Sequence, residues 1–164
     1  MGPQDDGPLE ARPPTREDLL DLCRELNARN VDYMVVGGMA IIQHGYLRAT
    51  EDIDLLVRTT LENERNVIDA LLCLPDKAAA ELEPGDIEKY NVIRVADEFV
   101  VDLMHQACGI DFQEAAPFIK KVTIDEVEIP FASLELLWRM KQTVREKDKL
   151  DLLFIREQLK KNQR

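Results

Sequence analysis

Cysteine, histidine and long apolar runs are scarce in this sequence, and each scarcity excludes a class of protein. The three cysteines, Cys23, Cys73 and Cys108, are an odd number without paired spacing, which argues against a disulfide framework. The two histidines, His44 and His105, lie far apart and outside any zinc-binding pattern. No apolar run reaches the roughly 20 residues that a membrane span needs, and no basic segment leads into an apolar one near the start. We therefore expect a cytoplasmic protein without a membrane anchor.

Positive charge is also in short supply. The chain has 21 lysines and arginines against 32 aspartates and glutamates, which gives a formal net charge of −11. A field of that sign repels polyanions, so broad binding to nucleic acids is disfavoured. With 164 residues, of which 45% are apolar and 32% charged, the composition is that of an ordinary globular protein with a core of its own.

The sequence divides into a short leader and one folded domain. Residues 1–14 are rich in proline and glycine and lack periodic apolar positions, which predicts a disordered lead-in. Thr15 and Asp18 then form a capping-box pattern, and apolar residues recur at helical spacing up to about Arg29. We expect a first helix there and a single domain over residues 15–164.

Helical and extended patterns follow each other through the rest of the domain. Apolar residues at helical spacing predict helices, and alternating or uniformly apolar runs bounded by turn residues predict strands. The expected strands cover residues 33–36, 52–57, 90–95, 98–104, 119–124 and 126–129, the last of them ending before Pro130. The expected helices cover residues 39–45, residues 60–75, a segment that opens at Ser133, and a segment whose packing side carries Leu150, Leu153, Phe154 and Leu159.

The most informative run extends from Val35 to Val57. It joins a strand, the pair Gly37-Gly38, a short helix, and a second strand that carries Asp52 and Asp54. Residues two apart in a strand project from the same face, so both carboxylates would point to one place while their neighbours face the core. That geometry suits the binding of divalent cations.

Asp102 supplies a third carboxylate, on the second arm of a predicted hairpin. Its neighbours Val101 and Leu103 would face the opposite way. Mg²⁺ prefers oxygen ligands and suits a site built from two or three carboxylates plus phosphate oxygens. A less specific interpretation stays open, in which Asp102 is a strand-end charge and the paired aspartates form surface ion pairs with Arg48 or Arg58.

The glycine pair and the residues just before the paired aspartates favour a phosphate group nearby. Gly37 and Gly38 let the backbone approach a ligand closely, and the helix that follows offers unpaired N–H groups to an anion. Arg48 and Thr50 lie close enough in sequence to line the same cleft, with Arg48 as a clamp on phosphate. A plain turn at the glycines and a structural salt bridge at Arg48 are the competing interpretations.

A cationic segment near the C-terminal end contrasts with the acidic whole. It carries Lys141, Arg145, Lys147 and Lys149. A solvated helix face is the simplest interpretation for most of these residues. Lys141 differs, because it lies on the apolar side of the helix that opens at Ser133.

Four segments of the chain carry a family resemblance. They are V-G-G, then R-A-T-E-D-I-D-L-L-V, then V-V-D-L-M with the third aspartate, and finally I-P-F-A-S-L-E-L-L-W-R-M-K with R-E-K-D-K-L-D-L-L. Together they resemble the nucleotidyltransferase superfamily that includes DNA polymerase beta, over roughly residues 15–160. Within it the chain is similar to the small bacterial branch related to abortive-infection and minimal nucleotidyltransferases. One departure is that many members have Gly-Ser where this chain has Gly37-Gly38.

The resemblance implies an α/β (α+β) fold, with a mixed β-sheet flanked by helices and with C-terminal helices. It also implies Mg²⁺-dependent transfer of a nucleoside monophosphate from a nucleoside triphosphate (NTP) to an acceptor hydroxyl, with two Mg²⁺ ions when the NTP is bound. The catalytic and metal-ligating residues that it implies are Asp52, Asp54 and Asp102. The residues that it places around the nucleotide are Gly37, Gly38, Arg48, Thr50 and Lys141.

The identity of the acceptor and the level of activity stay open at this point. The acceptor is a protein, an RNA end or a small molecule, because a fold alone does not specify it. The alternative function is a weakly active or inactive protein of the same fold that acts as an antitoxin or regulatory partner of a toxin, which the acidic surface and the diglycine variant favour. Metal-dependent hydrolysis is a third class, but it usually calls for histidine ligands that this chain does not cluster.

Overall fold

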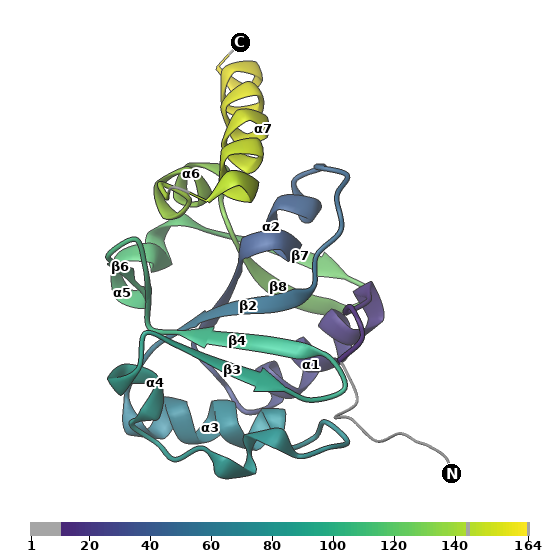
Figure 1. Cartoon of the computed structure of the whole chain (residues 1–164), viewed down its shortest axis with the longest axis vertical. Helices are drawn as coiled ribbons and strands as arrows, with labels where there is room; N and C mark the ends of the chain where they lie inside the picture. Colours follow the sequence, from purple (N-terminus) through teal and green to yellow (C-terminus); the bar gives the residue numbers. More distant parts are fainter. Residues whose placement is uncertain (1–10, 144, 164) are drawn as a thin grey trace.

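A six-stranded mixed sheet with helices on both faces forms the body of the protein (Figure 1). The structure, a computed structural model, describes residues 11–143 and 145–163, and the prediction of a mixed sheet flanked by helices is confirmed. Residues 1–10 of the predicted lead-in lie outside the described residues. In the part that is described, the backbone N–H of Arg12 donates to the Glu98 carbonyl at 3.1 Å, and its guanidinium pairs with Asp18.

The sheet has the strand order β3-β4-β2-β1-β8-β7. Its strands are β1 (Tyr33–Val36), β2 (Asp52–Val57), β3 (Val92–Ala96), β4 (Val100–Met104), β7 (Ile119–Ile124) and β8 (Val127–Ala132). Strand β2 pairs antiparallel with β1 and parallel with β4, so the strand that carries the paired aspartates is an inner strand. A separate two-stranded ribbon consists of β5 (Gln106–Ala107) and β6 (Ile110–Asp111).

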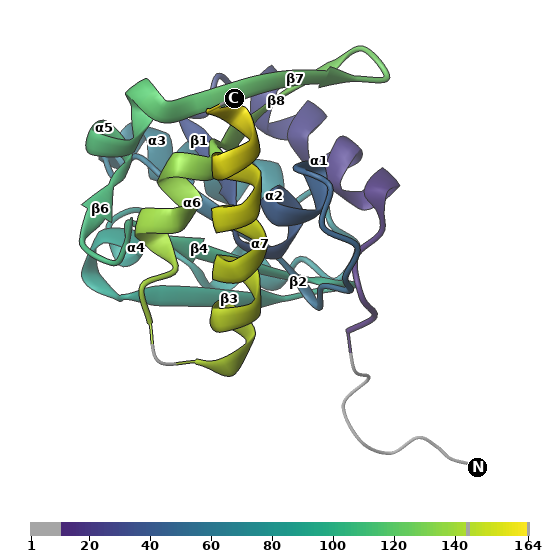
Figure 2. The same ribbon diagram turned by 90° about the horizontal axis from the view of Figure 1, so that it is seen from above.

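The helices divide between the two faces of the sheet. One face carries α1 (Arg16–Ala28) and α3 (Leu61–Leu71), which contact each other. The other face carries α2 (Gly37–Gln43), α6 (Leu134–Met140) and α7 (Glu146–Asn162), as the two views show (Figures 1 and 2). The short helices are α4 (Asp86–Lys89), α5 (Phe112–Ala115), η1 (Ala78–Glu81) and η2 (Ala116–Phe118). No helix in the described part of the chain is long and apolar enough to cross a membrane.

The start of α1 follows the predicted capping box. The Thr15 hydroxyl accepts a hydrogen bond from the Asp18 N–H at 3.2 Å, and the Asp18 carboxylate accepts one from the Thr15 N–H at 2.7 Å. Two N–H groups that the first turn would leave unpaired are thus satisfied. The apolar stripe of the helix, which includes Leu22 and Leu26, is buried against the sheet.

Several element boundaries differ from the expected ones, and the differences at α2 and β8 involve glycine and proline. Helix α2 begins at Gly37 instead of Met39, so both glycines belong to its first turn. Strand β8 does not end before Pro130 but continues to Ala132. Proline has no N–H to donate, and the ladder between β8 and β1 is correspondingly sparse, with Val35 opposite Phe131 as its recorded pair.

The predicted packing side of α7 is wrong for two of its residues. Leu150 and Leu153 are 58% and 54% exposed. The residues that α7 buries are Asp148, Asp151 and Ile155. This face is buried because its aspartates form ion pairs with Arg48 and Lys141.

Candidate functional site

The register of the sheet brings three carboxylates together. Asp52 and Asp54 lie on the same face of β2, while Ile53 between them is fully buried. Asp54 lies directly beside Asp102 in the parallel ladder of β2 and β4. One carboxylate oxygen from each of the three aspartates lies within 4.8 Å of the others. Three carboxylate oxygens at these distances are suitable ligands for a divalent cation.

Mutual repulsion and burial make this cluster reluctant to carry three negative charges. Burial, followed by the charges of Asp52 and Asp102, raises the pKa of Asp54 to about 7. Burial also raises the pKa of Asp102, against the lowering effect of its hydrogen bonds from Arg94. A divalent cation would relieve both effects, and the all-oxygen donor set fits Mg²⁺ by its chemistry.

Arg94 is the charged partner of the cluster, and the sequence reasoning missed it. Strand β3 places Arg94 opposite Asp102. Its guanidinium donates to both oxygens of Asp102 at 3.1 Å and lies 3.4 Å from Asp52. The alternative ion pairs with Arg48 or Arg58 are therefore wrong, since Arg48 pairs with Asp151 and Arg58 with Asp32.

Gly37 lies so close to the carboxylate cluster that no other residue fits at its position. Its φ of +65° is a backbone conformation that residues with a side chain rarely adopt. A Cβ built on it would lie 1.9 Å from Oδ2 of Asp54, which is a severe overlap. The absence of a side chain therefore lets the backbone at the junction of β1 and α2, here called the glycine turn, pass directly beside the Asp54 carboxylate.

Gly38 is required by packing against the segment that precedes β2. A Cβ at this position would lie 2.5 Å from Oγ1 of Thr50 and 3.2 Å from the guanidinium of Arg48. The Thr50 hydroxyl donates to the Asp52 carbonyl at 3.0 Å. The glycine turn, the segment at residues 48–50 and the start of β2 thus form one close-packed unit.

Arg48 and Lys141 converge on the buried carboxylate of Asp151. Nε of Arg48 lies 2.9 Å from Asp151, and Nζ of Lys141 lies 3.0 Å from the same carboxylate and 3.2 Å from Asp148. The Lys141 side chain is only 8% exposed, and both carboxylates are fully buried. Arg48 therefore forms the salt bridge of the competing interpretation, and Lys141 is a buried charge, unlike a solvated helix face.

Asp148 anchors the other end of this network. Burial alone would raise its pKa, but hydrogen bonds from Thr143, Arg145 and Lys141, together with the Lys141 charge, hold the pKa of Asp148 below its ordinary value. Thr143 donates at 2.5 Å and Arg145 at 2.8 Å. The network fixes the base of α7 next to the carboxylate cluster, which explains why this helix buries aspartates.

One cavity of about 760 Å³ joins these features. All eight residues that the sequence predicted for the site line it, namely Gly37, Gly38, Arg48, Thr50, Asp52, Asp54, Asp102 and Lys141. Further cations on its lining are Arg94, Arg145 and Lys147. Carboxylates from the sheet and cations from the segment between α6 and α7 therefore face the same space. Such a division suits a ligand that carries both metal ions and phosphates.

Comparison with known proteins identifies the fold. No protein-family model and no curated protein sequence matches the chain. Among solved structures, it is similar to the lincosamide antibiotic adenylyltransferase LnuA with lincomycin bound, with a TM-score of 0.58, 15% identity, and coverage of 88% of this chain and 98% of that one. It is also similar to an antigenic nucleotidyltransferase-like protein from Paracoccidioides brasiliensis, with a TM-score of 0.57, 18% identity, and coverage of 88% and 78%. The chain has the nucleotidyltransferase fold.

Proposed function

We propose that this chain, which has the nucleotidyltransferase fold, transfers a nucleoside monophosphate from an NTP to an acceptor hydroxyl in a Mg²⁺-dependent reaction. The observation that carries the proposal is the group of three carboxylates, Asp52, Asp54 and Asp102, beside the glycine turn. A cationic segment lines the same cavity. We place the reaction in the cytoplasm, in keeping with the unpaired cysteines.

The three aspartates would hold Mg²⁺, with two ions when the NTP is bound. Bound there, the ions supply charge neutralisation at the triphosphate and acidify the acceptor hydroxyl. The donor set supports this assignment because all three side chains offer oxygen and lie within 4.8 Å of one another.

The remaining residues of the site would orient the triphosphate. The backbone at Gly37 and Gly38 lies open to the cavity next to Asp54, so phosphate oxygens can approach it closely. Arg48 and Lys141 are held in place by Asp151 and contribute a fixed positive field more than a mobile clamp. Thr50 would keep the segment before β2 in register through its bond to the Asp52 carbonyl.

Asp102 is the group best placed to receive the acceptor proton. In the transfer step the acceptor oxygen forms a bond to the α-phosphorus, the bond from that phosphorus to the pyrophosphate oxygen breaks, and pyrophosphate leaves with the electron pair. The hydroxyl proton passes to the Asp102 carboxylate. Arg94 must release at least one oxygen of Asp102 for this role, which its 63% exposed side chain permits.

The acceptor class is a protein, an RNA end or a small molecule. The solved structure of LnuA holds lincomycin, so a fold neighbour binds a small organic molecule. The net charge of −11 disfavours RNA. We therefore rank a small-molecule hydroxyl first.

A label-transfer experiment tests the reaction. The purified protein is incubated with each of the four NTPs, labelled at the α-phosphate, and with a cell extract that is then separated into protein, RNA and small molecules. We expect Mg²⁺-dependent label in one fraction with the wild type and its loss with Asp102→Asn. Equal labelling by the two proteins would contradict the proposal.

An inactive binding protein is the second candidate, favoured by the diglycine where many members of the superfamily have Gly-Ser. In that case the chain would act as an antitoxin or other regulatory partner, and its acidic surface would face a basic protein. Pull-down from the native cells separates the two candidates. A basic partner recovered with wild-type protein that transfers no label would favour this candidate, and recovery of the chain alone would count against it.

A further inference from the structure

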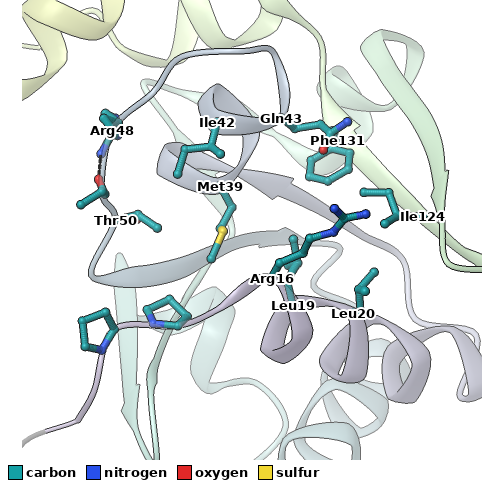
Figure 3. Close-up of a pocket in the computed structure, with 13 residues that line it drawn as sticks. Arg16, Leu19, Leu20, Met39, Ile42, Gln43, Arg48, Thr50, Ile124 and Phe131 are labelled. Carbon is teal, nitrogen blue, oxygen red and sulfur yellow. Dashed lines mark hydrogen bonds between the residues drawn. The ribbon is translucent and has the colours of Figure 1, made fainter.

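A second cavity, of about 570 Å³, lies behind the segment at residues 48–50 (Figure 3). It is bordered by the start of α1, by α2, by this segment and by the β7–β8 hairpin. Arg48, Ala49 and Thr50 line both this cavity and the one that holds the carboxylates. Its volume falls in the range of small-molecule sites.

The lining of this cavity is largely apolar and contains no carboxylate. Leu19, Met39, Ile42 and Phe131 contribute aliphatic and aromatic surface. None of the lining residues is an aspartate or glutamate, although these make up 32 of the 164 residues of the chain. In a protein of net charge −11, an anion in this cavity is thus spared repulsion from a lining carboxylate.

Arg16 provides the positive charge that is free to meet a ligand. Arg48 is engaged with Asp151, but Arg16 forms no ion pair within residues 11–143 and 145–163. Figure 3 shows its side chain reaching from α1 into the space bordered by Gln43, Phe131 and Ile124. A cation at the mouth of an apolar cavity complements a molecule with an apolar body and an anionic end.

We propose that this cavity is a binding site for a small organic anion with a flat or aliphatic apolar body, such as an aromatic carboxylate or sulfonate. The body contacts Met39, Ile42 and Phe131, and the anionic group pairs with Arg16. A molecule bound in this cavity contacts the segment at residues 48–50. This segment packs against Gly38 and donates a hydrogen bond to the Asp52 carbonyl. A bound anion therefore also changes the affinity for Mg²⁺-NTP, a consequence that rests on the proposed function.

A matched pair of fluorescent probes tests the site. 8-Anilinonaphthalene-1-sulfonate is anionic, and N-phenyl-1-naphthylamine has the same ring system without the sulfonate. We expect both to bind the wild type with one site. Arg16→Gln should weaken the anionic probe about five- to tenfold and change the neutral probe less than twofold, since it removes only the charge partner.

Ile42→Trp supplies the steric test. Ile42 is half-buried and lines the cavity, so a tryptophan at this position should fill the cavity and abolish binding of both probes. Leu61→Trp, which adds the same indole at a 66% exposed position outside the cavity, should change neither. Circular dichroism confirms that each variant is folded.

Several outcomes overturn the site. They are absence of binding to the wild type, unchanged binding to Ile42→Trp, and equal weakening of both probes by Arg16→Gln. The probe titrations need no nucleotide, so failure of the proposed function leaves them intact. If Mg²⁺-NTP binds, and a saturating concentration of 8-anilinonaphthalene-1-sulfonate leaves the affinity for Mg²⁺-NTP unchanged, the link between the two cavities is refuted while the proposed function stands.

Discussion

Neutralising Asp54 should stabilise the metal-free protein at neutral and higher pH. The carboxyl is buried beside Asp52 and Asp102, and burial and those charges raise its pKa from 3.8 to about 7. Asn has nearly the same shape, carries no charge, and can still donate a hydrogen bond toward Asp52. We therefore expect Asp54→Asn to unfold at a higher temperature than the wild type in EDTA at pH 8, although it loses a metal ligand.

The magnitude follows from the shift in pKa. Raising the pKa of Asp54 from 3.8 to about 7 corresponds to about 4 kcal/mol, at about 1.4 kcal/mol for each tenfold change in the acid dissociation constant. Because the three carboxylates share their charge, we expect an advantage of about 2 to 4 kcal/mol for the variant. Because the folded-state pKa is raised, the stability that the protonated Asp54 carboxyl contributes is present in full below about pH 4 and is lost as the pH rises through about 7. The advantage of Asp54→Asn should therefore be roughly 5 to 15 °C at pH 8 and should vanish near pH 4.

Thermal unfolding followed by circular dichroism at pH 4, 6 and 8, in EDTA, measures this difference. Asp97→Asn is the matched control, because Asp97 is also buried but accepts hydrogen bonds from the N–H groups of Asp76, Ala78 and Glu98. That variant should lose about 1 to 3 kcal/mol, since an amide nitrogen would then face these donors. Equal or lower stability of Asp54→Asn at pH 8 would refute the account of the cluster.

Three other substitutions test the surroundings of the cluster. Gly37→Ala should lower the free energy of unfolding by about 2 kcal/mol or more in urea titration, because its Cβ overlaps a carboxylate; Gly109→Ala, with a similar φ but nothing within 4 Å, should cost less, and equal costs would remove the steric argument. Arg94→Gln should raise Mn²⁺ affinity without nucleotide about two- to fivefold in EPR titration by removing a competing cation, and weaker binding would contradict this. Lys141→Met should cost about 3 kcal/mol in the same urea assay by leaving the Asp151 network short of a charge, and wild-type stability would show that Lys141 is dispensable.

The strands that carry the carboxylates were predictable because their patterns are local. Alternation placed Asp52 and Asp54 on one face of a strand whose observed bounds, Asp52–Val57, equal the predicted ones. The same argument placed Asp102 on the face opposite to Val101 and Leu103. The alternation of residues along one strand does not say which strand pairs with which, and that information came from the family resemblance.

Arg94 was missed because its role depends on the register of a hairpin. The predicted arms were residues 90–95 and 98–104, and the observed strands are Val92–Ala96 and Val100–Met104. With the observed strands matched end to end, Arg94 lies opposite Asp102. The predicted arms begin two residues earlier, so matching them end to end does not bring Arg94 opposite Asp102.

The orientation of α7 was unpredictable from periodicity. Apolar residues occur on all sides of this helix, so no single stripe marks the core face. The face that is buried carries Asp148 and Asp151, whose partners Lys141 and Arg48 lie elsewhere in the chain. Long-range ion pairing of this kind leaves no local signal in the sequence.

Isothermal titration of ATP, GTP, CTP and UTP into the purified protein tests the central claim most directly. The titrations are run with Mg²⁺ and again with EDTA, and they are repeated with Asp54→Ala. We expect at least one NTP to bind the wild type with Mg²⁺, and that binding to disappear with EDTA and in the variant, because the carboxylates then hold no cation for the triphosphate. Absence of binding by all four NTPs, or binding that survives both EDTA and the substitution, would contradict a nucleotide site built on these carboxylates.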